Sequence, residues 1–244
     1  MFQKASINWL FIIICVVMLF AGCSSLNTET DLLECDAATM THFPYTDNGV
    51  IVVKHQECTP VADIPGLTRI ETFYVNEGKP ITVRAYEMCR TEIKVQDTIA
   101  WSLQPSSTSG RLDWVLPVTE GFAKENYLGM NNTDYGGGIP MIDVWQRNGG
   151  VAIGLIEPVL RTISMPIEWK RYDDKISMAL RYEFEHPVTL NTGDTLHTFS
   201  AFRYEHTGDY FNALRTFSEV MQQEAGIQLP ASEPEAFEPV WCAW

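Results

Sequence analysis

The chain has 244 residues with a formal net charge of −14, and 45% of its residues are hydrophobic. The excess of negative charge argues against nucleic acid and anionic lipid surfaces as partners. The apolar content is typical of a packed globular body, and the length suits one large domain or somewhat more.

The first 22 residues have the features of a secretory signal peptide. A short charged start precedes an apolar run over residues 10–20, which is too short for a membrane-spanning helix of about 20 residues. Cys23 follows two small residues, and this arrangement resembles the cleavage box of bacterial lipoproteins. The resemblance implies an acylated Cys23, a membrane tether over residues 23–45 and export to the cell envelope. A plain signal peptide with an incidental cysteine is the alternative.

From residue 46 to residue 206 the sequence predicts β-strands almost throughout. Turn signals, such as the one at residues 147–150, separate runs rich in β-branched and aromatic residues. No helical pattern alternates with these runs, so we expect antiparallel pairing in a large two-sheet β-sandwich. The expected strands, in chain order, cover residues 50–53, 69–75, 80–88, 99–103, 111–118, 139–146, 151–157, 160–169, 175–185 and 195–204.

The hydrophobic period changes beyond the last of these strands. Residues 209–225 carry apolar side chains at helical spacing, and Asp209 is the expected N-cap. A segment rich in proline and glutamate follows, so we expect a linker helix and a linker over residues 207–232.

The sequence becomes apolar again near its end. Residues 238–244 include Trp241 and Trp244 and have the pattern of a buried strand, which would need further chain to cover it. We therefore expect residues 233–244 to begin a second domain, and the chain to be an N-terminal part of a longer protein.

The least ordinary stretch is rich in glycine. Three consecutive glycines follow Asp134 and Tyr135, and the strand after them carries Asp143 and Trp145 on one face. A carboxylate accepts hydrogen bonds from sugar hydroxyls, and an aromatic ring stacks on the C–H face of a pyranose. These four residues are therefore candidate carbohydrate contacts. A tight turn, with Trp145 in the core and Asp143 capping a loop, is the alternative.

This stretch, together with residues 157–159 and 238–244, resembles the N-terminal region of α-galactosidase-like glycoside hydrolases, the melibiases of family thirty-six and their relatives. The resemblance implies a β-supersandwich, a linker helix and the first strand of a (β/α)8 barrel whose remainder is missing here. It also implies a retaining mechanism whose two carboxylates lie in later barrel strands. No catalytic residue is therefore assigned, and the chain alone is expected to be inactive. Trp241 and Trp244 would either wall the sugar pocket or fill the barrel core.

Neither a cofactor nor a metal is expected. The sequence has no CxxC pair and no HExxH pattern, and spacing does not assign disulfides among Cys35, Cys58, Cys89 and Cys242. The expected partners are an oligosaccharide or polysaccharide with α-linked galactose, the membrane through the lipid anchor, and a second copy through the helix face and the terminal strand. Two other functions stay open: a stand-alone surface lipoprotein that binds glycans, and an assembly module.

Overall fold

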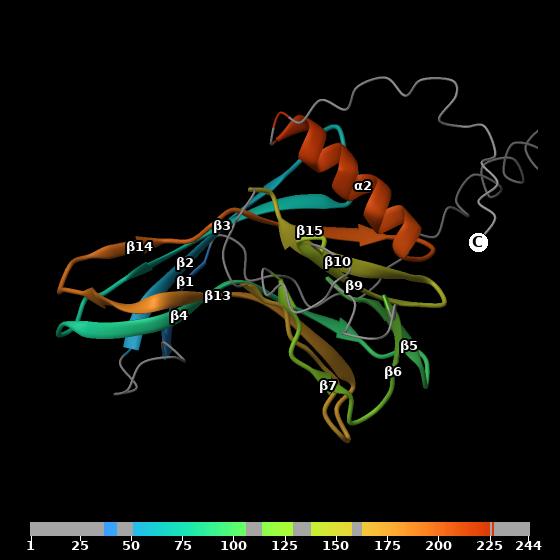
Figure 1. Cartoon of the computed structure of the whole chain (residues 1–244), viewed down its shortest axis with the longest axis horizontal. Helices are drawn as coiled ribbons and strands as arrows, with labels where there is room; N and C mark the ends of the chain where they lie inside the picture. The colour runs from blue at the N-terminus through green and yellow to red at the C-terminus, as the bar shows by residue number, and fades with distance from the viewer. Residues whose placement is uncertain are drawn as a thin grey trace, which may run out of the picture. The chain divides into compact units, whose positions relative to one another are not determined.

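The structure, a computed structural model, describes residues 37–42, 51–105, 114–128, 138–157, 163–224 and 226. The predicted signal peptide, Cys23 and the predicted barrel strand lie outside these residues. In the described part, the chain forms two antiparallel β-sheets and a single helix, α2 (Figure 1). The expected mainly-β, two-sheet sandwich followed by a helix is thus confirmed.

The larger sheet has nine strands in the order β1-β2-β3-β15-β10-β9-β5-β6, with β14 also pairing with β3. Their bounds are β1 (Ala37–His42), β2 (Ile51–Pro60), β3 (Leu67–Val75), β5 (Ala100–Leu103), β6 (Val115–Val118), β9 (Met141–Gln146), β10 (Gly149–Leu155), β14 (Thr195–His197) and β15 (Ala201–His206).

The smaller sheet has six strands in the order β7-β12-β13-β11-β8, with β4 pairing with β13. Their bounds are β4 (Ile81–Lys94), β7 (Ala123–Lys124), β8 (Tyr127–Leu128), β11 (Ile163–Ser164), β12 (Ile167–Glu168) and β13 (Lys175–Leu190). The long, paired strands β4 and β13 make up most of this sheet, and each of the other four strands is only two residues long.

The main core lies between the two sheets, where alternate side chains of both inner faces meet. Ile153 of the larger sheet and Met88 of the smaller one are both fully buried there. A charged side chain, that of Arg203, links the two sheets across this core. Arg203 of β15 donates from Nε to the Thr91 hydroxyl on β4 at 3.1 Å, and its guanidinium also pairs with Glu205.

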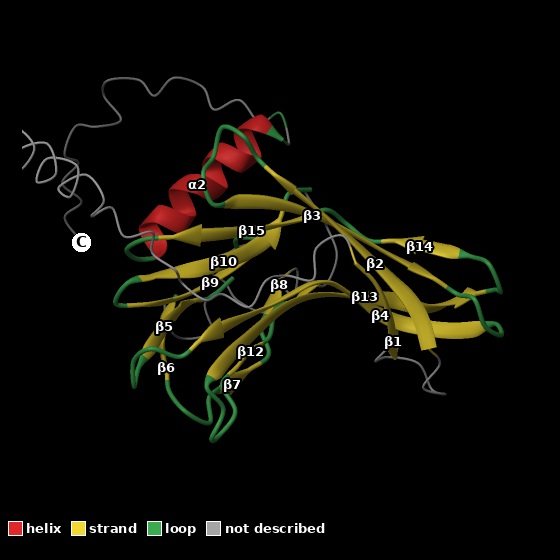
Figure 2. Ribbon diagram, turned by 180° about the vertical axis from the view of Figure 1, so that it is seen from behind, coloured by secondary structure: helices red, strands yellow, loops and turns green. Residues whose placement is uncertain are grey.

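Helix α2 (Tyr210–Gln223) packs on the outer face of the larger sheet, over β9, β10 and β15 (Figures 1 and 2). Its buried Ala213 and Val220 join a second apolar cluster with Phe202 of β15. The predicted cap is confirmed, because the Asp209 carboxylate accepts the Phe211 N–H at 3.1 Å. Residues 207–209 therefore form the whole connection between the end of β15 and the start of the helix.

Several strands differ from their predicted extent: β2 and β4 run on to Pro60 and Lys94, and the expected strand 160–169 is the two short strands β11 and β12. In two further cases, extra residues explain the difference. The expected strand 195–204 is two strands, since residues 198–200 stand opposite only residues 71–72 of β3. Strand β13 continues past residue 185 through Pro187, which has no N–H for the ladder. The sheet accommodates this proline with a register shift between Glu183 and Val188.

The N-terminal boundary of the sandwich also needs correction. Strand β1 pairs with β2 along its whole length, so residues 37–42 belong to the larger sheet and not to the tether expected over residues 23–45.

The short strands β7 and β8 were not predicted, because a segment of two residues is too short to show a hydrophobic period. Of the cysteines in the described part, Cys58 is disulfide-bonded and Cys89 is a buried free thiol.

Candidate functional site

The structure places two of the predicted carbohydrate-binding residues, and Asp134, Tyr135, Trp241 and Trp244 lie outside the residues it describes. Asp143 and Trp145 stand two positions apart on β9, on the face of the larger sheet that α2 covers. Their surroundings differ, however. Trp145 is partly exposed and lines a pocket, whereas the side chain of Asp143 is 0% exposed.

Asp143 is paired with a histidine from a distant part of the chain. Its Oδ1 lies 2.9 Å from Nε2 of His206, the last residue of β15, and both side chains are fully buried. The other imidazole nitrogen, Nδ1, lies 3.3 Å from the Thr207 carbonyl oxygen. Asp143 therefore supports the sheet behind the pocket wall, and direct contact with sugar, as expected from the sequence, would require this side chain to leave His206.

Burial and mutual contact shift both pKa values of this pair upward. Loss of solvent raises the pKa of Asp143, and the hydrogen bond and charge of His206 offset only part of this effect. Burial by itself lowers the pKa of His206, but the hydrogen bond and charge of Asp143 outweigh it, so that the pKa is raised. The folded chain thus binds a proton at this pair more tightly than the unfolded chain does.

This pair makes stability depend on pH in a defined direction. The stabilisation from protonated His206 is complete below its ordinary pKa of 6.5 and is lost as the pH rises through its raised value in the folded chain. We expect the free energy of unfolding to fall by up to about 1.4 kcal/mol per pH unit between pH 6.5 and that raised value, and to level off above it, as measured by urea unfolding. The Asp143→Asn/His206→Gln double variant keeps polar partners without titration and is the control. Parallel pH profiles for the two proteins would contradict the prediction.

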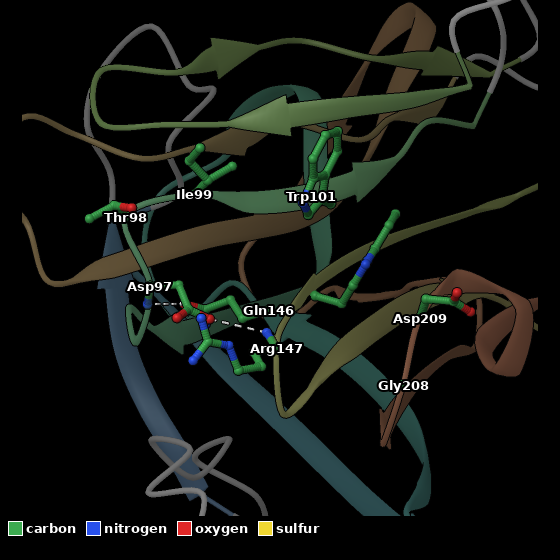
Figure 3. A pocket seen from close by; sticks show the side chains of 9 residues that line it. Asp97, Thr98, Ile99, Trp101, Gln146, Arg147, Gly208 and Asp209 are labelled. Carbon is green, nitrogen blue, oxygen red and sulfur yellow. Dashed lines mark hydrogen bonds between the residues drawn. The ribbon is translucent and has the colours of Figure 1, made fainter.

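An open pocket of about 500 Å³ lies beside the N-terminus of α2 (Figure 3). Three segments form it: the loop between β4 and β5 with the start of β5, the end of β9 with its turn, and the turn from β15 into α2. The residues that line the pocket include Asp97, Trp101, Trp145, Arg147, Gly208 and Asp209.

The two tryptophans of the pocket come from neighbouring strands. Trp101 of β5 stands directly opposite Trp145 of β9, so both indoles project from the same face of the larger sheet. Trp101 is 44% exposed. Trp145 packs on the apolar cluster under α2, and its ring centroid lies 5.4 Å from that of Tyr210.

Hydrogen bonds fix the loop that forms the other side of the pocket. Oε1 of Gln146 accepts the backbone N–H groups of Gln96 at 2.6 Å and Asp97 at 3.0 Å, while its Nε2 donates to the Lys94 carbonyl at 2.9 Å. The backbone N–H of Arg147 donates to Oδ2 of Asp97 at 3.1 Å. The Asp97 carboxylate is therefore held at the rim before any ligand arrives.

Within the described ranges, no three histidine, cysteine or acidic side chains gather in a way that could hold a metal ion. Within the same ranges, no helix has the length and apolar character needed to cross a membrane. The side chains that line the pocket include two indoles, two carboxylates and one guanidinium. Such a combination offers an aromatic surface together with hydrogen-bonding groups of both kinds.

No protein-family model matches the chain, and no curated protein does so. Solved structures are similar to it. The family thirty-six α-galactosidase AgaB from Geobacillus stearothermophilus has a TM-score of 0.53 at 13% identity, over 78% of this chain and 29% of that one. An α-galactosidase from Lactobacillus brevis has a TM-score of 0.52 at 12% identity, over 77% and 28% of the two chains. A doubly substituted AgaA from G. stearothermophilus, in complex with raffinose, has a TM-score of 0.51 at 13% identity, over 78% and 29%.

The chain spans less than a third of the length of each of these structures. At such low identities the likeness concerns the fold alone. The chain has the fold of the N-terminal β-sandwich of family thirty-six α-galactosidases.

Proposed function

We propose that this chain is the non-catalytic, N-terminal β-sandwich portion of an α-galactosidase-like glycoside hydrolase acting on α-linked galactosides. The observation that carries the proposal is the fold likeness to AgaB over 78% of this chain. Two further α-galactosidases, one of them in complex with raffinose, have the same likeness over similar shares of the chain. The order of a sandwich followed by helix α2 is the order that the sequence resemblance implies.

On this proposal, the reaction needs two carboxylates that the chain does not supply. A retaining glycosidase places an acid/base and a nucleophile about 5–5.5 Å apart on either side of the glycosidic bond. In the proposed enzyme both come from a barrel that follows residue 244. The sandwich supports that barrel, and Asp134, Tyr135, Trp241 and Trp244 are its proposed contributions to the sugar pocket.

We also propose that the protein is exported and held at the cell envelope by an acylated Cys23. The apolar N-terminal run and the small residues before Cys23 support this proposal. The disulfide at Cys58 is a second support, because disulfides persist in oxidising compartments and are rare in the cytosol.

The proposal is tested by extending the reading frame past codon 244 and assaying the longer product. An aryl α-galactoside should be hydrolysed by the extended protein and left intact by residues 1–244. An extended protein with βα units but no α-galactosidase activity would overturn the assignment of the substrate. A stop codon after residue 244, with measurable oligosaccharide binding by the chain, would support the alternative of a stand-alone glycan-binding lipoprotein.

A further inference from the structure

The pocket at the N-terminus of α2 is lined by two tryptophans, and one of them, Trp101, belongs to neither core cluster. Trp101 keeps 44% of its surface exposed at the edge of the helix-covered face, so part of its ring is open to a ligand. Trp145 lies opposite it on the next strand. The two indoles on one face of the larger sheet give an apolar wall to an open pocket of about 500 Å³, within the usual size of ligand sites.

Polar groups stand around these indoles in fixed positions. Asp97 uses one carboxylate oxygen to accept the Arg147 N–H, and Asp209 uses one to accept the Phe211 N–H. Within the described part of the chain, the second oxygen of each carboxylate has no hydrogen-bond partner, so it is available to accept from a ligand. Figure 3 shows Asp97 and Arg147 close together, with Asp209 at another side of the pocket.

The charges narrow the class of ligand. Two carboxylates in a chain of net charge −14 disfavour a nucleotide, a phosphorylated sugar or another anion. A flat cationic ligand would face the Arg147 guanidinium. A neutral molecule with one apolar face and several hydroxyl groups is repelled by neither the carboxylates nor the guanidinium. Its apolar face can stack on the indoles, and its hydroxyls can donate to the carboxylates.

We propose that this pocket binds a pyranose ring of a neutral glycan, stacked on Trp101 and Trp145, with hydroxyl hydrogen bonds to Asp97 and Asp209. Galactose suits the indoles well, because its axial hydroxyl leaves the C–H groups of positions three, four and five together on one face. The choice of galactose rests on the proposed function, whereas the pyranose site rests on the pocket alone. The site contains none of the carboxylates assigned to the barrel, so it would bind a glycan without cleaving it.

The experiment measures binding of raffinose to the chain by isothermal titration and by changes in tryptophan fluorescence. Trp101→Ala should weaken binding by about tenfold or more, as for a central aromatic contact. Because Trp101 is 44% exposed, the variant should still fold, which circular dichroism checks. Trp145→Phe should weaken it by a smaller factor and keep the packing under α2. Asp97→Asn should weaken it severalfold, because an amide is a poorer acceptor than a carboxylate.

The matched control is Tyr172→Ala, which removes an aromatic side chain that is 96% exposed and does not line the pocket. It should bind raffinose like the unaltered chain. No binding of raffinose, maltotriose or cellotriose by the chain, or equal binding by Trp101→Ala, would overturn the site. The chain could bind raffinose in a manner that depends on Trp101 while its extended form lacks α-galactosidase activity. That result would overturn the proposed function but support the glycan site. Binding of maltotriose or cellotriose in preference to raffinose would overturn only the choice of galactose.

Discussion

Replacing His206 with phenylalanine is expected to lower the free energy of unfolding by about 3–5 kcal/mol at neutral pH, the usual cost of removing one partner of a buried ion pair. The substitution leaves the carboxylate of Asp143 fully buried with no charged partner. Its Oδ2 already has no hydrogen-bond partner among the described residues. Urea unfolding, followed by circular dichroism, measures the loss.

Two comparisons separate the buried charge from simple loss of packing. The loss should shrink in acid, because the orphaned Asp143 then binds a proton and becomes neutral. The Asp143→Asn/His206→Phe double variant should regain a large part of the stability at neutral pH, since no charge remains to be buried. If the single and double variants are equally unstable at neutral pH, the electrostatic explanation fails.

Gly149→Ala is expected to cost about 3 kcal/mol or more, at the upper end of the range for overpacking. Gly149 opens β10 with a φ of +136°, and a Cβ there would lie 2.1 Å from the backbone oxygen of His206. Relief requires the β9–β10 turn to move away from β15. Because that turn follows Trp145, the variant should also change the tryptophan fluorescence and weaken glycan binding.

Gly193→Ala is the matched control for Gly149→Ala. Gly193 also has a left-handed φ, at +85°, but nothing lies within 4 Å of an added Cβ. It should therefore lose only the backbone strain of about 1–2 kcal/mol, with no change at the pocket. Equal losses in the two variants would show that close contact with His206 contributes nothing.

Local patterns were sufficient to predict most of the sandwich. The β9–β10 hairpin was expected at residues 139–146 and 151–157 and is found at Met141–Gln146 and Gly149–Leu155, because turn residues fix a hairpin over a few positions. The end of β13 was missed for the opposite reason. Pro187 is a local stop signal, and only a register shift against β4, far away in the sequence, lets the strand continue.

The pocket was predictable only in part. Alternation along one strand places Asp143 and Trp145 on the same face, and this is what the structure has. The partner of Asp143 lies 63 residues away, and no local pattern reveals it. Trp101 and Asp97 were not recognised as site residues, since the pairing of β5 with β9 depends on the order of strands in the sheet. Two tryptophans in separate strands were the only available signal.

Arg203 gives the sandwich resistance to shear. Hydrophobic contact between two sheets is non-directional, so it opposes separation of the layers more strongly than sideways sliding. The bond from Arg203 to Thr91 ties β15 to β4 at one point. If one layer slid along the other, this bond would break, and Arg203 would keep only Glu205 of its own strand as a partner. The Thr72 hydroxyl of β3 also donates to the Met88 carbonyl of β4 at 2.7 Å. Such directional bonds help to set the lateral alignment of the two layers, because each must break before the sheets can slide.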